Sequence, residues 1–197
     1  MSSVKITGNA SGSGILTFSA PNTDSDRTIN IPDKAGSIAL GAGAIVQTLS
    51  TNLTSASTVS STGSGASRTD ISGLSVAITP TSSSSKILII AYVNIIGDET
   101  ANTVTIGLKR DSTAIFIGDS ASSRPRGSAN GYASDVDAGI ISNTIVTLDS
   151  PSTTSATTYK IEAGSNATFY VNRTVQDSDN DDFTRSASSI TVMEVLG

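Results

Sequence analysis

The stretch KILIIAYVNII, residues 86–96, decides what kind of fold this chain can adopt. Its odd-numbered positions are all apolar, and on the alternate face Leu88, Ile90, Tyr92 and Ile96 are apolar as well. Because successive side chains of a strand point to opposite faces, a strand of this kind is covered on both sides. In a two-layer sandwich the outer face normally meets water, so its cover is either another subunit or a loop of the same chain. We favour the subunit.

Eight further segments between residues 45 and 195 have the pattern of strands. They are rich in β-branched and aromatic residues, and turn residues separate most of them. These segments are 45–51, 70–80, 103–110, 112–119, 138–148, 157–163, 167–174 and 188–195. No segment shows the apolar periodicity of an amphipathic helix. The spacing of the strand-like segments therefore predicts an all-β, antiparallel β-sandwich of the jelly-roll kind. The tight connections at 110–112 and 163–166 predict β-hairpins.

Composition agrees with strands and excludes several kinds of chemistry. The 197 residues include 35 serines and 26 threonines, whereas only 15% are charged, so the side chains typical of helix surfaces are scarce. The chain has no Cys, His or Trp, which excludes disulfides, thiolate or imidazole metal sites and Ser-His-Asp hydrolysis. Paired carboxylates remain the only catalytic option, and nothing places two of them across a cleft. We therefore expect no enzymatic activity and no cofactor.

Charge and hydropathy limit the classes of partner that the chain can bind. The net charge is −5 and the basic residues are scattered, so we expect no nucleic-acid partner. The longest apolar run, 86–96, falls short of the roughly 18 residues that a membrane helix needs, which predicts no membrane insertion. The N-terminal sequence MSSVKITGNASGSG lacks the apolar core of a signal peptide. We expect a soluble protein made in a cytoplasm.

The first 44 residues differ from the rest. Short strand-like pieces alternate with turns, and Pro21 and Pro32 end two of them. Each piece is too short to bury a face by itself, so the pattern predicts a thin β stem that gains its core by wrapping against copies of itself. The Gly/Ala sequence GAGA at 41–44 marks the boundary. We predict a stem over 1–44 and a head over 45–197.

Two long stretches without strand pattern, 118–139 and 175–187, are the places where we expect recognition. In the first, Arg124, Arg126 and Tyr132 suit the gripping of a sugar or an anionic polymer by forked hydrogen bonds and ring stacking. The alternative is that the arginines only offset the charge of nearby aspartates.

The second stretch contains the acidic sequence QDSDNDDFTR, residues 176–185. Its aspartates alternate as in a helix-loop-helix calcium loop, but Asp182 takes the place of the required Gly and Ser188 that of the required Glu. We therefore predict a solvated turn without a metal, with Arg173 or Arg185 offsetting the charge. A looser cation site is the alternative.

These residues carry a resemblance to a known family. The segment GILTFSAPNTDSDRTINIPDKAGSIAL, 14–40, resembles the N-terminal repeat of tailed-phage fibre and structural proteins, in which G-x-L-T-F-x-A-P leads into R-T-I-x-x-P-D-x-x-G. The segments DISGLSVAITPTSSSSKILI, GLKRDSTAIFIGD and SSITVMEV are similar to the C-terminal domain of such proteins.

The resemblance implies an intertwined homotrimer, a virion fibre whose β stem carries a jelly-roll head similar to those of the complement and tumour-necrosis-factor type. The N-terminal segment would attach to other virion proteins, and the head would bind host-surface polysaccharide. A chain of 197 residues is far shorter than a long tail fibre. The alternative is therefore a capsid decoration, head-fibre or neck protein with a structural role and no host recognition. Tail, neck and capsid surface are all compatible locations.

Overall fold

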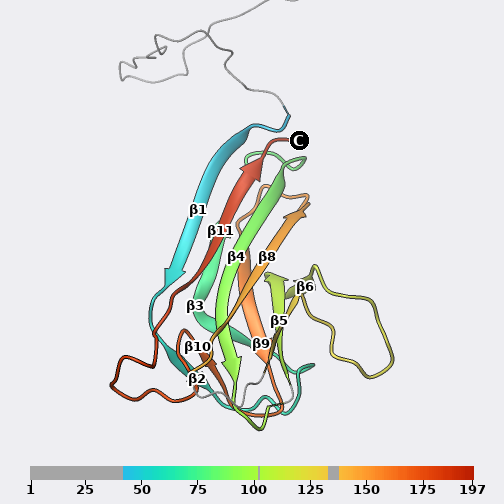
Figure 1. Cartoon of the computed structure of the whole chain (residues 1–197). Coiled ribbons are helices and arrows are strands. Elements are labelled where there is room, and N and C mark those ends of the chain that lie inside the picture. The colour runs from blue at the N-terminus through green and yellow to red at the C-terminus, as the bar shows by residue number, and fades with distance from the viewer. Residues whose placement is uncertain (1–41, 102, 133–137) are drawn as a thin grey trace, which may run out of the picture. The chain divides into compact units, whose positions relative to one another are not determined.

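The computed structural model describes residues 42–101, 103–132 and 138–197 (Figure 1). The predicted stem, residues 1–44, therefore lies almost wholly outside the described residues. Those that are described belong to the unit that spans 39–197. Within these ranges, none of the chain forms a helix that is long and apolar enough to cross a membrane.

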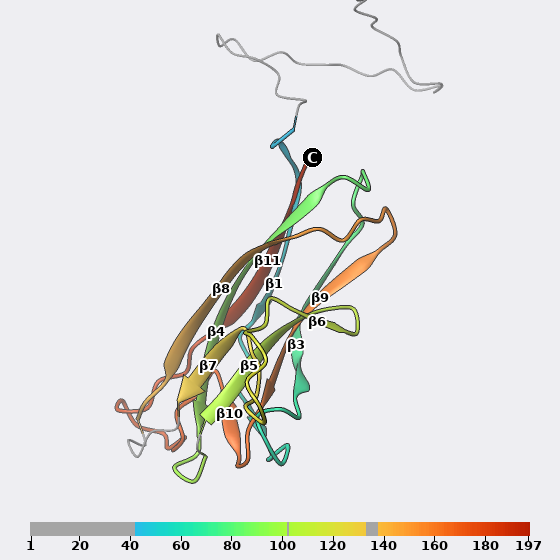
Figure 2. The same ribbon diagram turned by 90° about the vertical axis from the view of Figure 1, so that its right-hand side faces the viewer.

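The fold is all-β, as predicted, and consists of two antiparallel sheets packed face to face (Figures 1 and 2). The six-stranded sheet contains β1 (Ile45–Leu53), β2 (Ser57–Val59), β4 (Lys86–Gly97), β8 (Ile141–Asp149), β10 (Phe169–Val171) and β11 (Ser188–Val195). The five-stranded sheet contains β3 (Thr69–Ile78), β5 (Thr103–Arg110), β6 (Thr113–Ile115), β7 (Ala129–Tyr132) and β9 (Thr157–Gly164). Each of the nine predicted segments contains a strand.

The long strands alternate between the two sheets along the chain. The six-stranded sheet takes β1, β4, β8 and β11, while the five-stranded sheet takes β3, β5 and β9 between them. Neighbours within a sheet are therefore distant in sequence, as where β1 pairs with β11. β4 lies between β11 and β8, which places the most apolar segment in the middle of its sheet.

The core lies between the sheets, and the predicted alternation of β4 is confirmed on its inner face. Ile87, Ile89 and Ile95 are each 0% exposed. They pack in one cluster with residues of the opposite sheet, including Leu108 of β5 and Tyr159 of β9. Because each large apolar side chain contributes about 1.5–3 kcal/mol on full burial, this cluster is the main source of stability in the single chain.

One of the two predicted hairpins is confirmed and the other is wrong. β5 and β6 pair antiparallel across a tight turn, with Arg110 opposite Thr113. The segment 163–166, in contrast, carries the chain from one sheet to the other, because β9 and β10 belong to different sheets. Ser165 is held at this crossing by Thr62, whose backbone N donates to Ser165 O at 3.0 Å and whose Oγ1 accepts from Ser165 N at 3.0 Å. A partner 103 residues away in sequence outweighs the local turn signal.

Two short strands were not predicted. β2 pairs with β10, and β7 lies inside the predicted loop 118–139, where it pairs with β5. The sequence ANGY of β7 resembles a turn because of its Gly. Gly131 is required here by close packing, since a Cβ at this position would lie 3.1 Å from Ile95 Cγ2.

Candidate functional site

The outer face of the six-stranded sheet carries a strip of large apolar side chains. The strip, called here the apolar face, consists of Leu88, Ile90 and Tyr92 on β4, Val146 and Leu148 on β8, and Met193 on β11. Register places them together, because Ile90 lies opposite Val146, and Leu88 lies opposite both Leu148 and Met193. Residues directly opposite each other in an antiparallel pair share a face of the sheet. The strip is therefore continuous across three strands.

Several members of the apolar face are open to solvent in the single chain. Val146 is 53% exposed, Leu148 49% and Tyr92 42%. Within the part of the chain that the structure describes, no loop closes over them. The positions beside the strip are also neutral, as where Ser50 Oγ of β1 and Thr191 Oγ1 of β11 lie 2.9 Å apart. Lys86 is the one charged residue at an outward-facing position of β4.

The outer face of the five-stranded sheet is, by contrast, strongly charged. Arg68 Nε donates to Glu162 Oε1 at 2.6 Å, and Asp70 accepts from Lys109 at 2.8 Å and from Lys160 at 3.1 Å. The hydrogen bond from Lys109 holds the pKa of Asp70 below its ordinary value, with Lys160 acting in the same direction. The two outer faces of the sandwich thus differ in kind: one suits water, and the other suits an apolar partner.

The predicted binding residues lie on β7 and on the loop that precedes it. Tyr132 is 61% exposed on β7, and Arg124 is exposed on the loop before it. Arg126 is used within its own loop, because its Nε donates to Gly118 O at 2.6 Å. Arg68 also donates to Arg126 O at 2.7 Å. Of the described carboxylates, none pairs with Arg124 or Arg126.

The same loop begins with a feature that the sequence did not reveal. Phe116 has a φ of 50° and is 51% exposed. A bulky residue in the left-handed region is strained, and such residues are common at binding and catalytic sites. Phe116 lines a shallow hollow of about 280 Å³ together with Ile117, Gly118, Gly127 and Ser128.

The aspartate-rich segment is a turn held by arginine. Asp177 accepts hydrogen bonds from Arg185 Nε at 2.9 Å and Arg185 Nη2 at 2.5 Å, and Arg173 Nη1 lies 3.8 Å from the same carboxylate. The hydrogen bonds from Arg185 lower the pKa of Asp177. The predicted offset by arginine is confirmed for this aspartate. In the ranges that the structure covers, no group of three or more acidic side chains is arranged to hold a metal ion.

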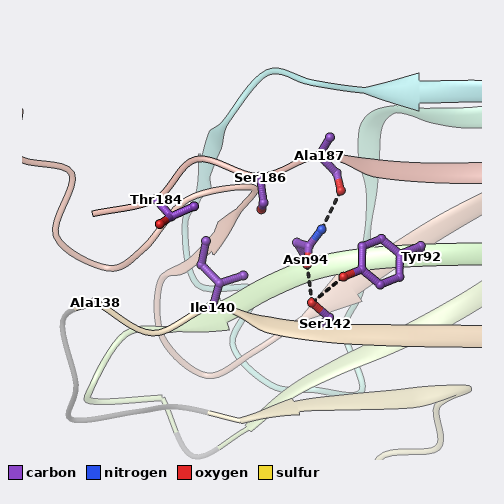
Figure 3. A pocket seen from close by; sticks show the side chains of 8 residues that line it. All are labelled: Tyr92, Asn94, Ala138, Ile140, Ser142, Thr184, Ser186 and Ala187. Atoms are coloured by element: carbon purple, nitrogen blue, oxygen red, sulfur yellow. Dashed lines mark hydrogen bonds between the residues drawn. The ribbon is translucent and has the colours of Figure 1, made fainter. Parts of the chain in front are cut away.

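A second concave site lies at the end of the apolar face, and we call it the polar pocket (Figure 3). It has a volume of about 380 Å³ and is lined by Tyr92, Asn94, Ala138, Ile140, Ser142, Thr184, Ser186 and Ala187. β4 and β8 supply its floor, and the segment before β11 supplies the other wall.

A chain of hydrogen bonds runs through the polar pocket. Tyr92 Oη donates to Ser142 Oγ at 2.8 Å, and Ser142 Oγ donates to Asn94 Oδ1 at 2.6 Å. Asn94 is 3% exposed, and its Nδ2 donates to Ala187 O at 2.5 Å. Ser186 Oγ is buried and has no hydrogen-bond partner. The only sequence signal for this site is Asn94 itself, the one polar residue in the run 87–96.

The chain matches no model of a known protein family and no curated protein sequence. The two outer faces, the polar pocket and the loops are the features of the molecule that bear on its function.

Proposed function

We propose that this chain is a trimeric structural fibre protein of a tailed-phage virion, whose head binds polysaccharide on the host surface without catalysis. The observation that carries the proposal is the contrast between the two outer faces. Charged residues cover the five-stranded sheet, whereas Val146, Leu148 and Tyr92 leave the six-stranded sheet apolar and half exposed. Contiguous exposed apolar surface on a soluble protein is typical of an interface.

A second copy of the chain is the occupant that best fits the apolar face. The strip holds no acidic or basic side chain that would select a charged partner, and an identical neutral strip is complementary to it. Closed rings of identical subunits satisfy such surfaces completely. The chain has no Cys, so association takes the stabilising role that disulfides have in other extracellular proteins.

Strand topology supports the jelly-roll form of the head. A jelly roll folds its strands into two sheets joined by connections that repeatedly cross between them. A jelly roll requires successive long strands to alternate between the two sheets, and the long strands of this chain do so in the order β1, β3, β4, β5, β8, β9 and β11. Attachment to the virion would be the role of the N-terminal segment, whose sequence carries the resemblance to phage fibres.

Host recognition would come from several weak contacts in each of three subunits. Linking identical sites raises the avidity by orders of magnitude without any single strong pocket. The polar pocket and the loop that bears Phe116 and Arg124 are the exposed regions that offer suitable groups.

A second role, in which the chain decorates the capsid or belongs to the head fibre or neck, is favoured by one observation. Arg126, a predicted contact residue, already has its Nε bonded to Gly118 O. A loop that is held by such an internal hydrogen bond is as suitable for a structural surface as for a ligand-binding surface.

Competition for host cells tests the proposal. Purified full chain should reduce adsorption of the phage that carries it, in proportion to its concentration. A chain that binds no host cell, together with electron micrographs that place it on the capsid, would replace host recognition by the decorating role.

A further inference from the structure

The polar pocket has the chemistry of a site for one neutral sugar unit, and we propose that it binds a neutral hexose of a surface glycan. This inference rests on the proposed host recognition and names the site and the ligand class. None of the described lining residues is charged, so these residues offer nothing to neutralise a carboxylate or phosphate. A neutral ligand with several hydroxyl groups fits the pocket best.

The direction of the hydrogen bonds decides which groups are left for a ligand. Tyr92 and Ser142 both donate their hydroxyl hydrogens within the pocket, Tyr92 to Ser142 and Ser142 to Asn94. Their oxygens keep lone pairs and act as acceptors. Ser186 Oγ, which is buried and has no protein partner, supplies a proton donor from the opposite wall once its side chain rotates toward the ligand. Acceptors on one side and a donor on the other match neighbouring sugar hydroxyls, each of which both donates and accepts.

The unpartnered hydroxyl of Ser186 is the strongest single sign of a ligand. A buried polar group without a partner costs about 1–3 kcal/mol, so native proteins seldom leave one unsatisfied. Figure 3 shows Ser186 on the wall across from the Tyr92, Ser142 and Asn94 chain. Rotation about the Cα–Cβ bond of Ser186 would bring this buried hydroxyl to a ligand hydroxyl placed between the two walls, which would satisfy Ser186 and extend the chain of hydrogen bonds.

Shape and apolar surface agree with a single sugar ring. A volume of about 380 Å³ lies at the small end of ligand pockets, which run from roughly 300 to 1,000 Å³. Tyr92 is 42% exposed and stands where the apolar face meets the pocket, so the side of its ring that lines the pocket gives an aromatic surface for the C–H face of a sugar while a second copy covers the rest of the apolar face. Ile140 and Ala187 add small apolar contacts.

The test uses the full chain, labelled with ¹⁵N, and four neutral probes: glucose, galactose, mannose and N-acetylglucosamine. Titration of at least one of them to about 50 mM should shift the side-chain amide signal of Asn94 and the backbone signals of Ser142 and Ser186, as expected for millimolar affinity. Glucuronate, which adds a carboxylate to the same ring, should bind more weakly than glucose.

Ser186→Ala is the decisive variant, because Ser186 Oγ makes no bond within the protein and its removal leaves the fold unchanged. The loss of one hydrogen bond should weaken sugar binding about three- to tenfold. Ser112→Ala, at an exposed position in the turn between β5 and β6, is the matched control and should bind as the parent chain does. If no probe shifts the pocket signals, or if Ser186→Ala binds as tightly as the control, the proposal is wrong.

The outcomes separate this inference from the proposed function. A chain that blocks phage adsorption without sugar-induced shifts in the pocket overturns the pocket and leaves host recognition in place. Shifts that depend on Ser186 in a chain that never competes for host cells support the pocket and count against host recognition.

Discussion

Ile90 and Val146 lie directly opposite each other on the outer face of the six-stranded sheet, at the centre of its most apolar strand pair. Val146 is 53% exposed, so a polar residue there leaves the core intact. This pair is therefore where folding and association can be separated by a single substitution.

Val146→Asp should prevent self-association while the chain remains folded. A carboxylate at the middle of the apolar face would be desolvated on association, which costs several kcal/mol for an unpaired charge. Sedimentation velocity at micromolar concentration should show a monomer, and circular dichroism should show an unchanged fold. Ala77→Asp is the control, since Ala77 is exposed on the charged outer face of the other sheet. An oligomer that survives Val146→Asp would place the interface elsewhere.

Acid should destabilise the β-sandwich through Glu194. This carboxylate is 0% exposed on β11 and accepts from Gln47 Nε2 at 2.5 Å and from Thr81 N and Oγ1 at 2.7 Å each. Burial alone would raise its pKa, but these hydrogen bonds outweigh burial and lower the pKa of Glu194 to about 2, from an ordinary value of 4.5. A lowered folded-state pKa gives stability that is fully present above pH 4.5 and is lost as the pH falls toward 2.

Glu194→Gln tests this directly. Urea unfolding at pH 7 should show the variant to be less stable than the parent chain, because Gln offers an amide group where the carboxylate accepts. The difference should shrink between pH 4.5 and pH 2, where the parent loses its charge. Asp70 and Asp177 also have lowered pKa values, but they are present in both proteins and cancel in the comparison. If the difference in free energy of unfolding between Glu194→Gln and the parent chain did not change with pH, the charge of Glu194 would have no role in stability.

Gly107→Ala should destabilise the five-stranded sheet. Gly107 lies beneath the Arg68–Glu162 ion pair, and a Cβ there would meet Glu162 Oε1 at 2.7 Å and Arg68 Nε at 2.8 Å. Moving this largely buried pair should cost about 1–3 kcal/mol in the free energy of unfolding. Gly118→Ala, where a Cβ would meet nothing within 4 Å, should change stability by no more than about 0.5 kcal/mol. If Gly107→Ala and Gly118→Ala changed the thermal stability equally, the Arg68–Glu162 ion pair would be able to move aside without loss of stability.

Tyr159→Phe should weaken the contact between the two sheets. Tyr159 of β9 is 0% exposed, and its Oη donates to Asp149 Oδ2 of β8 at 2.7 Å. Burial, with the nearby Asp149 carboxylate, raises the pKa of Tyr159, so the phenol is protonated and donates at the neutral pH of the measurement. A hydrogen bond to a charged group contributes about 1.5–3 kcal/mol, and the variant should lose about that amount in urea unfolding.

Tyr170→Phe is the control for Tyr159→Phe. The Oη of Tyr170 lies 3.3 Å from Asp98 Oδ2, which is long for a hydrogen bond between oxygens. Its removal should change the free energy of unfolding only slightly. If Tyr170→Phe cost as much as Tyr159→Phe, the loss would not come from the bond between the sheets.

The positions of the strands could be predicted from the sequence because side-chain alternation is a local property. The run 86–96 indicated both its buried inner face and the apolar outer face that Val146 and Leu148 extend. The crossing at 163–166 could not be predicted, because its conformation depends on Thr62, which lies far away in the chain. β7 escaped prediction for the same reason, since its pairing with β5 compensates for a sequence that resembles a turn.

The sites were harder to predict than the strands. The polar pocket combines Asn94, Ser142 and Ala187, and the bond from Asn94 to Ala187 spans 93 residues of sequence. Nothing local distinguishes Ser142 or Ser186 from the other serines of a chain that has 35 of them. Arg126 shows the opposite limit, because the sequence indicates either a ligand contact or a counter-charge for nearby aspartates, whereas in the fold its Nε donates to Gly118 O within the loop.

Sedimentation equilibrium of the full chain at micromolar concentration tests the central claim, that copies of this chain cover the apolar face of one another. The expected mass is three times 19.9 kDa. A folded species of 19.9 kDa, with Val146 and Leu148 open to solvent, would contradict it.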